Sequence, residues 1–402
     1  MTTQGKGWPA LAALVVAVAV GSAIAHLCTS AMPFLVGALI NGYGLSATGA
    51  GLVGFFQVGA LAVSMILIAP IAHRFKPLRV CALGASLAAS CNALIYLAPA
   101  QLALICLLAT VVGVGYGLIL TAAVAAAAGS SRPDLTYAAG NSGALIIVVP
   151  MISALPLATL QFGSRGTFLA IPALIVVCAP LLFGLRRTRG AVVGVQVTGT
   201  TFVKGVPILA IWSLFSFGTG AMWAFTERIG VALALPGPTI GLILSTSAFT
   251  GLIGTSLAAV CSARVSRVAA LAVGVVGGGA SCLMFALATN LWMFATAAVL
   301  YWIFTMFVYI LLLGTAAVLD PTGRLGTFGT GCERLAFAIG APLGGLMVDY
   351  GSYVWVGVGA AIACSVIAPA FLPGLARALA ARIASSDATL AAGMRIEPAP
   401  KL

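Results

Sequence analysis

Residues 10–38 read ALAALVVAVAVGSAIAHLCTSAMPFLVGA, a stretch without a single Asp, Glu, Lys or Arg. A helix that crosses the roughly 30 Å hydrocarbon core of a membrane needs about 20 mostly apolar residues, and this run exceeds that length. A short polar segment precedes it, and no A-x-A-like cleavage site stands in a convincing context. The stretch therefore predicts a retained membrane-spanning helix.

The remainder of the chain repeats this pattern. Of its 402 residues, 62% are hydrophobic and 6% are charged, whereas soluble domains have roughly 45–50% and about 25%. Apolar runs of spanning length recur along the chain, bounded by charges, Pro or Gly pairs and polar clusters. They predict an all-α membrane protein with twelve transmembrane helices and no large soluble domain. The expected spans are 10–38, 48–72, 78–98, 101–127, 138–160, 167–185, 206–231, 239–262, 268–288, 290–318, 329–348 and 352–372.

The twelve runs fall into two groups of six. The longest polar-leaning connection separates the groups and carries Arg186, Arg187, Arg189 and Lys204. Near the end of the chain, residues 375–383 are expected to lie on the inner membrane surface as a short amphipathic helix. The expected organisation is a first six-helix half over 1–185, a cytoplasmic linker over 186–205, a second six-helix half over 206–373 and a cytoplasmic tail over 374–402.

The two halves also match each other in sequence. The matches keep one order and nearly one spacing, which indicates a duplicated six-helix unit and two pseudo-symmetric halves. Parallel repeats of this kind place a substrate site at the interface of the halves, near the bilayer midplane. Offsets of 190 and 191 residues align Ala31-Met32 with Ala221-Met222, Gly51-Leu52 with Gly241-Leu242, Arg74 with Arg264, Tyr137 with Phe328, and Gly140 with Gly331.

The net charge of +12 indicates membrane topology rather than nucleic-acid binding. The basic residues lie between apolar runs and do not gather with aromatic residues on one segment. If the N-terminus is inside, sixteen of the 19 basic residues fall on the inner side, Arg165 falls outside, and Arg228 and Arg334 lie within spans. The positive-inside rule then predicts an inner-membrane protein with both termini in the cytoplasm.

Enzyme chemistry and metal binding are not expected. The nine cysteines have no C-x-x-C spacing and lie almost entirely in apolar runs, as small packing residues do. The two histidines, His26 and His73, are far apart in the sequence, and no H-E-x-x-H motif occurs. We expect a monomer without cofactor that binds no nucleic acid, and whose partners are membrane lipids, a small organic substrate and protons.

Several sequence pieces resemble the major facilitator superfamily (MFS) of transporters. They are residues 45–52 (LSATGAGL), residues 69–76 (APIAHRFK), and residues 320–324 (DPTGR) ahead of residues 340–345 (GAPLGG). The resemblance covers essentially the whole chain and implies two six-helix halves that rock about a central site.

The loop after the second span departs from the family pattern. The family usually has Gly, Asp and Arg there, where an acidic and basic residues latch the cytoplasmic face. Here Ala69 and His73 stand where Gly and Asp are expected, and Arg74 keeps its type. Arg74 is therefore expected to have a gating or structural role, while the latch itself is altered.

Two signatures of drug exporters are missing. Proton-driven drug exporters of this superfamily typically carry a basic residue ahead of the glycines of the fourth span and a Gly-Pro-rich motif in the fifth. Residues 109–117 (ATVVGVGYG) hold no Arg or Lys, and no Gly-Gly follows Pro150. The first span also lacks the acidic D-G-F-D-like signature of the aromatic-acid importers of the superfamily. The differences in the fourth and fifth spans weigh against a drug antiporter, and the motifs do not assign a substrate.

Ionisable residues within spans are the main site candidates, because a charge at the membrane centre costs about 2.5 kcal/mol or more without a partner or a watery cavity. Glu227 and Arg228 lie in the outer part of the seventh span, with Trp223 and Phe225 nearby. They form either a substrate or proton site or an outer-gate ion pair. Because neighbouring helical residues point about 100° apart, one is expected to face the cavity and the other a neighbouring helix.

Glu333 and Arg334 repeat this dipeptide at the inner end of the eleventh span. Glu333 is expected in or near the first helical turn, where a carboxylate is favoured, so a structural or gating role ranks ahead of substrate binding. His26 lies near the middle of the first span, and histidine changes its charge readily near physiological pH. It is a candidate for proton coupling or substrate binding, against a neutral histidine that is hydrogen-bonded within the bundle.

Further candidates are polar or amphipathic side chains on the spans expected to line the cavity. An aromatic residue in a span is more often a packing residue or an interface anchor than a ligand contact. These candidates are Gln57, Tyr116, Asn141, Trp212, Trp223, Tyr301, Trp302 and Tyr309.

Together these features predict a secondary active transporter that moves a small organic solute by alternating access. Arg228 and Arg334 are the bases within the predicted spans and favour an organic anion, and Glu227 or His26 would couple transport to protons. A multidrug-type exporter of the same superfamily is one alternative. A non-cycling membrane sensor or assembly factor with a transporter fold is another.

Overall fold

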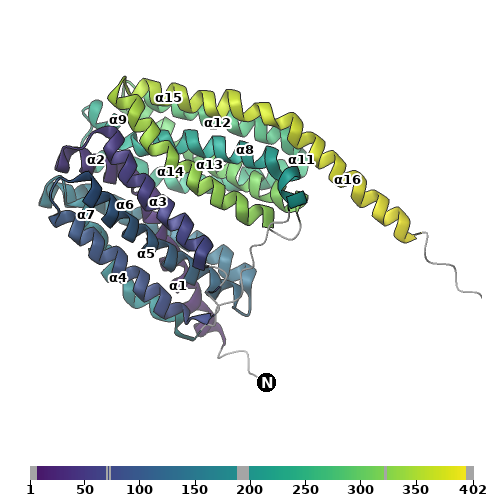
Figure 1. The fold of residues 1–402 in the computed structure, drawn as a ribbon, viewed down its shortest axis with the longest axis horizontal. Coiled ribbons are helices and arrows are strands. Elements are labelled where there is room, and N and C mark those ends of the chain that lie inside the picture. Colours follow the sequence, from purple (N-terminus) through teal and green to yellow (C-terminus); the bar gives the residue numbers. More distant parts are fainter. Residues whose placement is uncertain (1–6, 69–70, 72–73, 188–198, 321–323, 395–402) are drawn as a thin grey trace, which may run out of the picture.

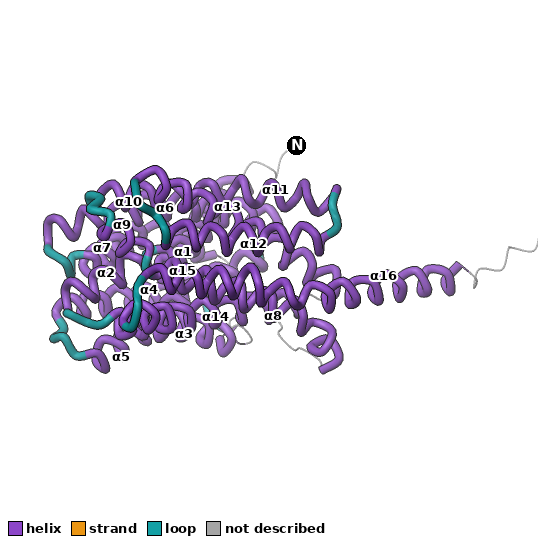
Figure 2. The backbone as a smooth tube through the Cα atoms, turned by 90° about the horizontal axis from the view of Figure 1, so that it is seen from above, coloured by secondary structure: helices purple, strands orange, loops and turns teal. Residues whose placement is uncertain are grey.

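The computed structural model describes residues 7–68, 71, 74–187, 199–320 and 324–394. Helices make up nearly all of these residues, and no strand occurs among them (Figure 2). The first half contains α1 (Gly7–Ser30), α2 (Met32–Tyr43), α3 (Ala47–Ile68), α4 (Pro77–Leu97), α5 (Leu102–Ala128), α6 (Pro133–Phe162), α7 (Thr167–Cys178) and η2 (Ala179–Arg187). The second half contains α8 (Gly199–Ala224), α9 (Thr226–Ala232), α10 (Gly237–Ser247), η3 (Ala248–Thr250), α11 (Gly251–Arg264), α12 (Arg267–Ala286), α13 (Leu291–Leu319), α14 (Arg324–Asp349), α15 (Tyr353–Ile362), η4 (Ala363–Ile367), η5 (Ala368–Phe371) and α16 (Leu372–Met394).

Eleven helical segments in the described part of the chain are long and apolar enough to cross a membrane. α14 is not among the eleven, and it carries Glu333 and Arg334 near its middle. It nevertheless packs within the bundle against α3 and α8, so it completes a set of twelve. The predicted all-α fold with two six-helix halves is therefore confirmed, and the chain is a multi-pass membrane protein.

The helices define two sides of the bundle. We call the side where α1 begins and α16 leaves the terminal side, and the opposite side, with the turn between α2 and α3, the distal side (Figure 1). α2 and α9 meet on the distal side, and α16 extends away from the bundle on the terminal side (Figure 1). If the prediction from the basic residues holds, the terminal side is cytoplasmic.

The first span of each half is broken in its distal part. α1 ends before Ala31 and α2 begins at Met32, while α8 ends at Ala224 and α9 begins at Thr226. Proline at position 33 contributes to the first break, because it has no backbone N–H to donate to the carbonyl of Thr29 four residues earlier. The two broken-off segments, α2 and α9, pack against each other across the interface of the halves.

Two apolar clusters form the core. The larger one runs through the whole first half and continues into the distal part of the second half, where it includes Phe225, Phe285 and Ala341. The smaller one lies in the terminal part of the second half, around Trp212 and Leu311. Apolar packing therefore joins the halves on the distal side, whereas the terminal part of the second half has a core of its own.

The last span continues into the tail without a separate surface helix. α15 leads through a π-helical turn at Ala363–Ile367 and a 3-10 turn into α16. The expected short amphipathic helix over 375–383 is part of this long α16, which points away from the bundle (Figure 1). Residues 395–402 lie outside the described part.

Candidate functional site

A hydrogen bond between the two halves joins His26 of α1 to Arg334 of α14. A guanidinium nitrogen of Arg334, Nη2, lies 3.2 Å from Nε2 of His26. On the other side of the ring, Nδ1 lies 2.7 Å from the carbonyl oxygen of Ser22, one turn earlier in α1. A carbonyl oxygen only accepts and a guanidinium only donates, so the imidazole carries its hydrogen on Nδ1 and accepts at Nε2. The two bonds together select the neutral form of His26.

Glu333 supplies the countercharge to Arg334. Its carboxylate oxygen lies 3.2 Å from Nε of Arg334, and 23% of the Arg334 side chain and 13% of the Glu333 side chain are exposed. α14 begins at Arg324, so Glu333 is the tenth residue of the helix and the expected position in the first turn is wrong. Capping of the helix N-terminus therefore does not explain this carboxylate.

Tyr309 of α13 completes the group of polar side chains. It lies close enough to Glu333 and Arg334 for both charges to act on its hydroxyl, and its ring packs edge-on against Trp212 with centroids 5.8 Å apart. We call His26, Tyr309, Glu333 and Arg334 the central cluster. It combines one cation, one anion and a neutral imidazole, drawn from α1, α13 and α14, at the interface of the halves.

Three aromatic rings lie on α8 and α13. Trp223 stacks on Tyr301 with centroids 5.1 Å apart and planes 15° apart, and Trp302 meets Trp223 edge-on at 5.4 Å. Trp223 and Tyr301 are buried, whereas Trp302 is partly exposed. We call these residues the aromatic cluster.

The aromatic cluster is tied to the first half by one hydrogen bond. The indole N–H of Trp223 donates to the carbonyl oxygen of Thr29 at 2.9 Å. This is the carbonyl that Pro33 leaves without its helical donor, and a carbonyl inside a membrane needs a partner because no water replaces it. The second half thus supplies a donor that the first half lacks.

Glu227 and Arg228 lie at the distal contact between α9 and α2. The Glu227 carboxylate presses directly on Gly37, where even a methyl group would collide with it. Nη1 of Arg228 donates to the side-chain oxygen of Asn41 at 3.0 Å, one turn further along α2. Both side chains of the dipeptide therefore meet the same helix of the other half, and neither is part of the central cluster.

Two further contacts close the distal side. The Asp349 carboxylate, at the end of α14, accepts the backbone N–H groups of Ala47 and Thr48 at 2.9 Å each, and so caps α3 in the other half. The hydroxyls of Ser153 in α6 and Ser245 in α10 lie 2.7 Å apart. Opposite pairs of helices are therefore joined on both flanks of the distal interface.

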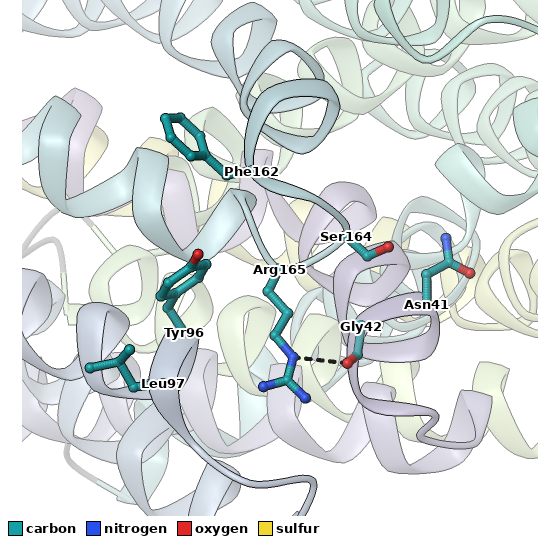
Figure 3. A pocket seen from close by; sticks show the side chains of 7 residues that line it. All are labelled: Asn41, Gly42, Tyr96, Leu97, Phe162, Ser164 and Arg165. Carbon is teal, nitrogen blue, oxygen red and sulfur yellow. Dashed lines mark hydrogen bonds between the residues drawn. The ribbon is translucent and has the colours of Figure 1, made fainter.

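A pocket of about 510 Å³ opens on the distal side of the first half (Figure 3). Arg165 stands at its centre, where Nε donates to the carbonyl oxygen of Gly42 at 2.9 Å and Nη1 to that of Ala98 at 3.1 Å. Its guanidinium also lies 4.0 Å from the centre of the Tyr43 ring. Arg165 thus holds the ends of α2 and α4 together. Asn41, which accepts a hydrogen bond from Arg228, lines the same pocket.

Of the remaining sequence candidates, Trp212 contacts the central cluster through Tyr309, and no contact named above involves the others. Gln57, Tyr116 and Trp212 are buried, whereas Asn141 and Arg74 are exposed. His73, which replaces the expected acid of the latch, lies outside the described residues. Sequence reasoning missed the partners Ser22, Thr29, Asn41 and Asp349. For Thr29 a signal was available, because Pro33 lies four residues later and cannot donate to its carbonyl.

Solved transporter structures share this architecture. The nucleoside transporter NupG has a TM-score of 0.67 and 14% sequence identity over 92% of this chain and 99% of its own. A bacterial homologue of the human lysosomal transporter Spinster has a TM-score of 0.66 in an inward-facing, unoccupied conformation, with 14% identity over 100% of both chains. Its occupied inward-facing form has a TM-score of 0.63, with 15% identity over 96% of this chain and 98% of its own. Neither a family model nor a curated protein matches the chain.

Proposed function

We propose that this chain, whose fold is that of the major facilitator superfamily, is a secondary transporter that carries a small organic anion together with protons across an inner membrane. The observation that carries the proposal is the bond between Arg334 and His26, which joins a partly exposed cation to a titratable ring of the other half. Parallel repeats place their substrate sites at this interface.

The central cluster suggests how an anion and a proton would move together. While Arg334 donates to Nε2 of His26, that nitrogen is occupied and cannot take a proton. A substrate carboxylate that engages the Arg334 guanidinium would compete for these N–H groups and release Nε2. The released imidazole could then be protonated, and the added positive charge would hold the anion more tightly. Binding of the anion and of the proton would thus favour each other.

The distal contacts serve as the gate of this cycle. Glu227 against Gly37, Arg228 with Asn41, and Asp349 with the start of α3 all join the two halves on the distal side. They must part before the central cluster can open to that side. With the terminal side in the cytoplasm, the described conformation is closed to the outside.

Two other functions remain as alternatives. A multidrug-type exporter of the same superfamily would use the aromatic cluster for lipophilic compounds and would have little need for Arg334. A sensor or assembly factor that has lost cycling would keep the distal contacts permanently. Neither gives a role to the hydrogen bond between His26 and Arg334, which is why transport of an anion is preferred.

A thermal-shift screen of the purified protein tests the proposal, because a ligand that binds only the folded state raises its apparent stability. The panel would hold organic acids, amino acids, sugars and cationic drugs. Stabilisation by anions that disappears in Arg334→Gln supports the proposal. Stabilisation by lipophilic cations alone, unaffected by that substitution, would favour the exporter.

A further inference from the structure

We infer that the transported anion is planar and aromatic, carries a hydrogen-bond acceptor on its ring, and lies with the ring beside Trp302 and the anionic group at Arg334. This inference rests on the proposed function and adds the substrate class. It comes from one face of α13, where Trp302, Thr305 and Tyr309 follow one another at spacings of three and four residues.

Trp302 is the open member of the aromatic cluster. Trp223 and Tyr301 are buried, and their polar hydrogens are donated to the carbonyl oxygens of Thr29 and Thr219. Trp302 is only partly buried, and within the described residues its indole N–H is buried and has no hydrogen-bond partner. A flat ligand ring beside Trp302 would extend the cluster, and an acceptor on the ring would pair the free N–H.

Thr305 carries the next polar group on this face, one turn further along. A threonine in a helix usually donates its hydroxyl to the carbonyl four residues earlier, as Thr315 of the same helix does to Leu311. The Thr305 hydroxyl is buried and makes no hydrogen bond within the described part of the chain. The Tyr301 hydroxyl is near it but donates to Thr219. Because the Tyr301 oxygen can still accept from Thr305, the Trp302 indole N–H is the buried group on this face of α13 that is left for a ligand.

The same face leads to the central cluster. Tyr309, seven residues after Trp302, lies close enough to Glu333 and Arg334 for their charges to act on its hydroxyl. Seven residues at 1.5 Å each separate the two ends by about 10 Å. A ligand that spans this distance has one ring, an acceptor on the far side of the ring, and a carboxylate. A substituted benzoate is of this size.

The acidic signature of known aromatic-acid importers is missing from the first span, so the recognition inferred here uses other groups. The carboxylate would be held by the Arg334 guanidinium, and the first span would contribute His26. The ring would be recognised by the second half alone, through α13.

Three carboxylates of matched size separate the two features of the ligand. Para-acetylbenzoate has both the ring and the acceptor, para-isopropylbenzoate has the ring without the acceptor, and para-acetylcyclohexanecarboxylate has the acceptor without the ring. Their dissociation constants would be measured on the full chain in lipid nanodiscs. Because an aromatic contact contributes about 0.5–1.5 kcal/mol beyond buried area, para-acetylbenzoate is expected to bind roughly three- to tenfold more tightly than the cyclohexane analogue. It should also bind more tightly than para-isopropylbenzoate.

Substitutions at Trp302 assign these preferences to the residue. Trp302→Leu should abolish the preference for the ring, while Trp302→Phe should keep it and lose the preference for the acceptor. Trp292 of the same helix is 78% exposed, so Trp292→Phe is the matched control and should change neither preference. Retained folding of each variant is checked by its melting temperature.

The failure of this inference differs from the failure of the proposed function. Equal affinity of all three carboxylates, with binding lost in Arg334→Gln, would overturn the aromatic class and leave anion transport in place. Absence of binding by any carboxylate to the unsubstituted protein would overturn both. If the preferences for the ring and for the acceptor persist unchanged in Trp302→Leu, the ligand ring is not bound beside Trp302 of α13.

Discussion

Trp223 of the second half donates its indole N–H to the carbonyl oxygen of Thr29 in the first half, at 2.9 Å. Pro33 has removed the only backbone donor that a regular helix would offer this carbonyl. The bond is therefore available while the distal side is closed and is lost when α8 moves away from α1. In the proposed transport cycle, this bond would make the Trp223 side chain a direct contributor to the balance between the two states.

Trp223→Phe should shift this balance toward distal opening. The substitution keeps the ring and removes the donor, and a buried carbonyl without a partner costs about 1–3 kcal/mol. The reporter is Ser245→Cys, because Ser245 is fully buried at the interface against Ser153. Its labelling by a maleimide added from the distal side should become at least about fivefold faster in the variant.

A second substitution tests the cause of that shift. Pro33→Ala restores a backbone N–H for the Thr29 carbonyl, so it should return the labelling rate of Trp223→Phe most of the way to the original value. In the unsubstituted background it should have a smaller effect, because the carbonyl is already paired. If Pro33→Ala changes the labelling rate equally in Trp223→Phe and in the unsubstituted protein, the unpaired Thr29 carbonyl does not explain why the Trp223 hydrogen bond stabilises the closed distal side.

Gly37→Ala should weaken the distal closure. The added methyl group would collide with the Glu227 carboxylate, which sits directly over the glycine. Because the carboxylate ends a flexible side chain that can shift, a cost at the lower end of the about 1–3 kcal/mol for overpacking in a core is expected. Gly59→Ala in α3 is the matched control, because nothing lies within 4 Å of its added methyl group. The labelling rate of Ser245→Cys is measured in both variants. Equal rates in Gly37→Ala and Gly59→Ala would contradict the tight contact between Gly37 and Glu227.

His26→Ala should uncouple transport from protons. In proteoliposomes, uptake of the substrate by the unsubstituted protein should rise when the external side is acidified, because anion and proton enter together. The variant should lose this dependence while still binding the anion through Arg334. Glu227→Gln should retain the dependence, since Glu227 lies at the α2–α9 contact and not in the central cluster. Uptake that is indifferent to both substitutions would exclude proton coupling through either residue.

Arg334→Lys should bind the anion about tenfold more weakly, although the charge is kept. Arg334 uses Nη2 for His26 and Nε for Glu333, and a lysine ammonium has one nitrogen in place of this planar fork. Dissociation constants from calorimetry measure the effect. Affinity equal to that of the unsubstituted protein would show that only the charge matters.

The fold follows from the sequence because membrane insertion imposes it. Each span must be long and apolar, and this requirement is visible residue by residue in runs such as 10–38. The exception is instructive: α14 begins at Arg324, whereas this span was expected to begin at residue 329. Glu333 was consequently expected in or near the first turn, whereas it lies about two and a half turns after the start of the helix.

The site was predictable in its residues but not in their pairing. His26, Glu333 and Arg334 stand out because ionisable groups in a membrane are costly. That His26 meets Arg334 is a property of the tertiary fold, since 308 residues separate them. Partners that are backbone groups, such as the Thr29 carbonyl or the Ala47 and Thr48 N–H groups, carry no side-chain signature at all.

The two apolar clusters divide the molecule differently from the duplicated sequence. The larger cluster packs the first half together with the distal part of the second half, and the smaller cluster gives the terminal part of the second half a separate core. We therefore expect that terminal part to unfold separately from the rest. Hydrogen exchange around Trp212 and Leu311 should accordingly follow a local unfolding event rather than the global one. The boundary at which this protein is expected to come apart when it unfolds thus runs through its second repeat, whereas the boundary at which it would open in the proposed cycle runs between the two repeats.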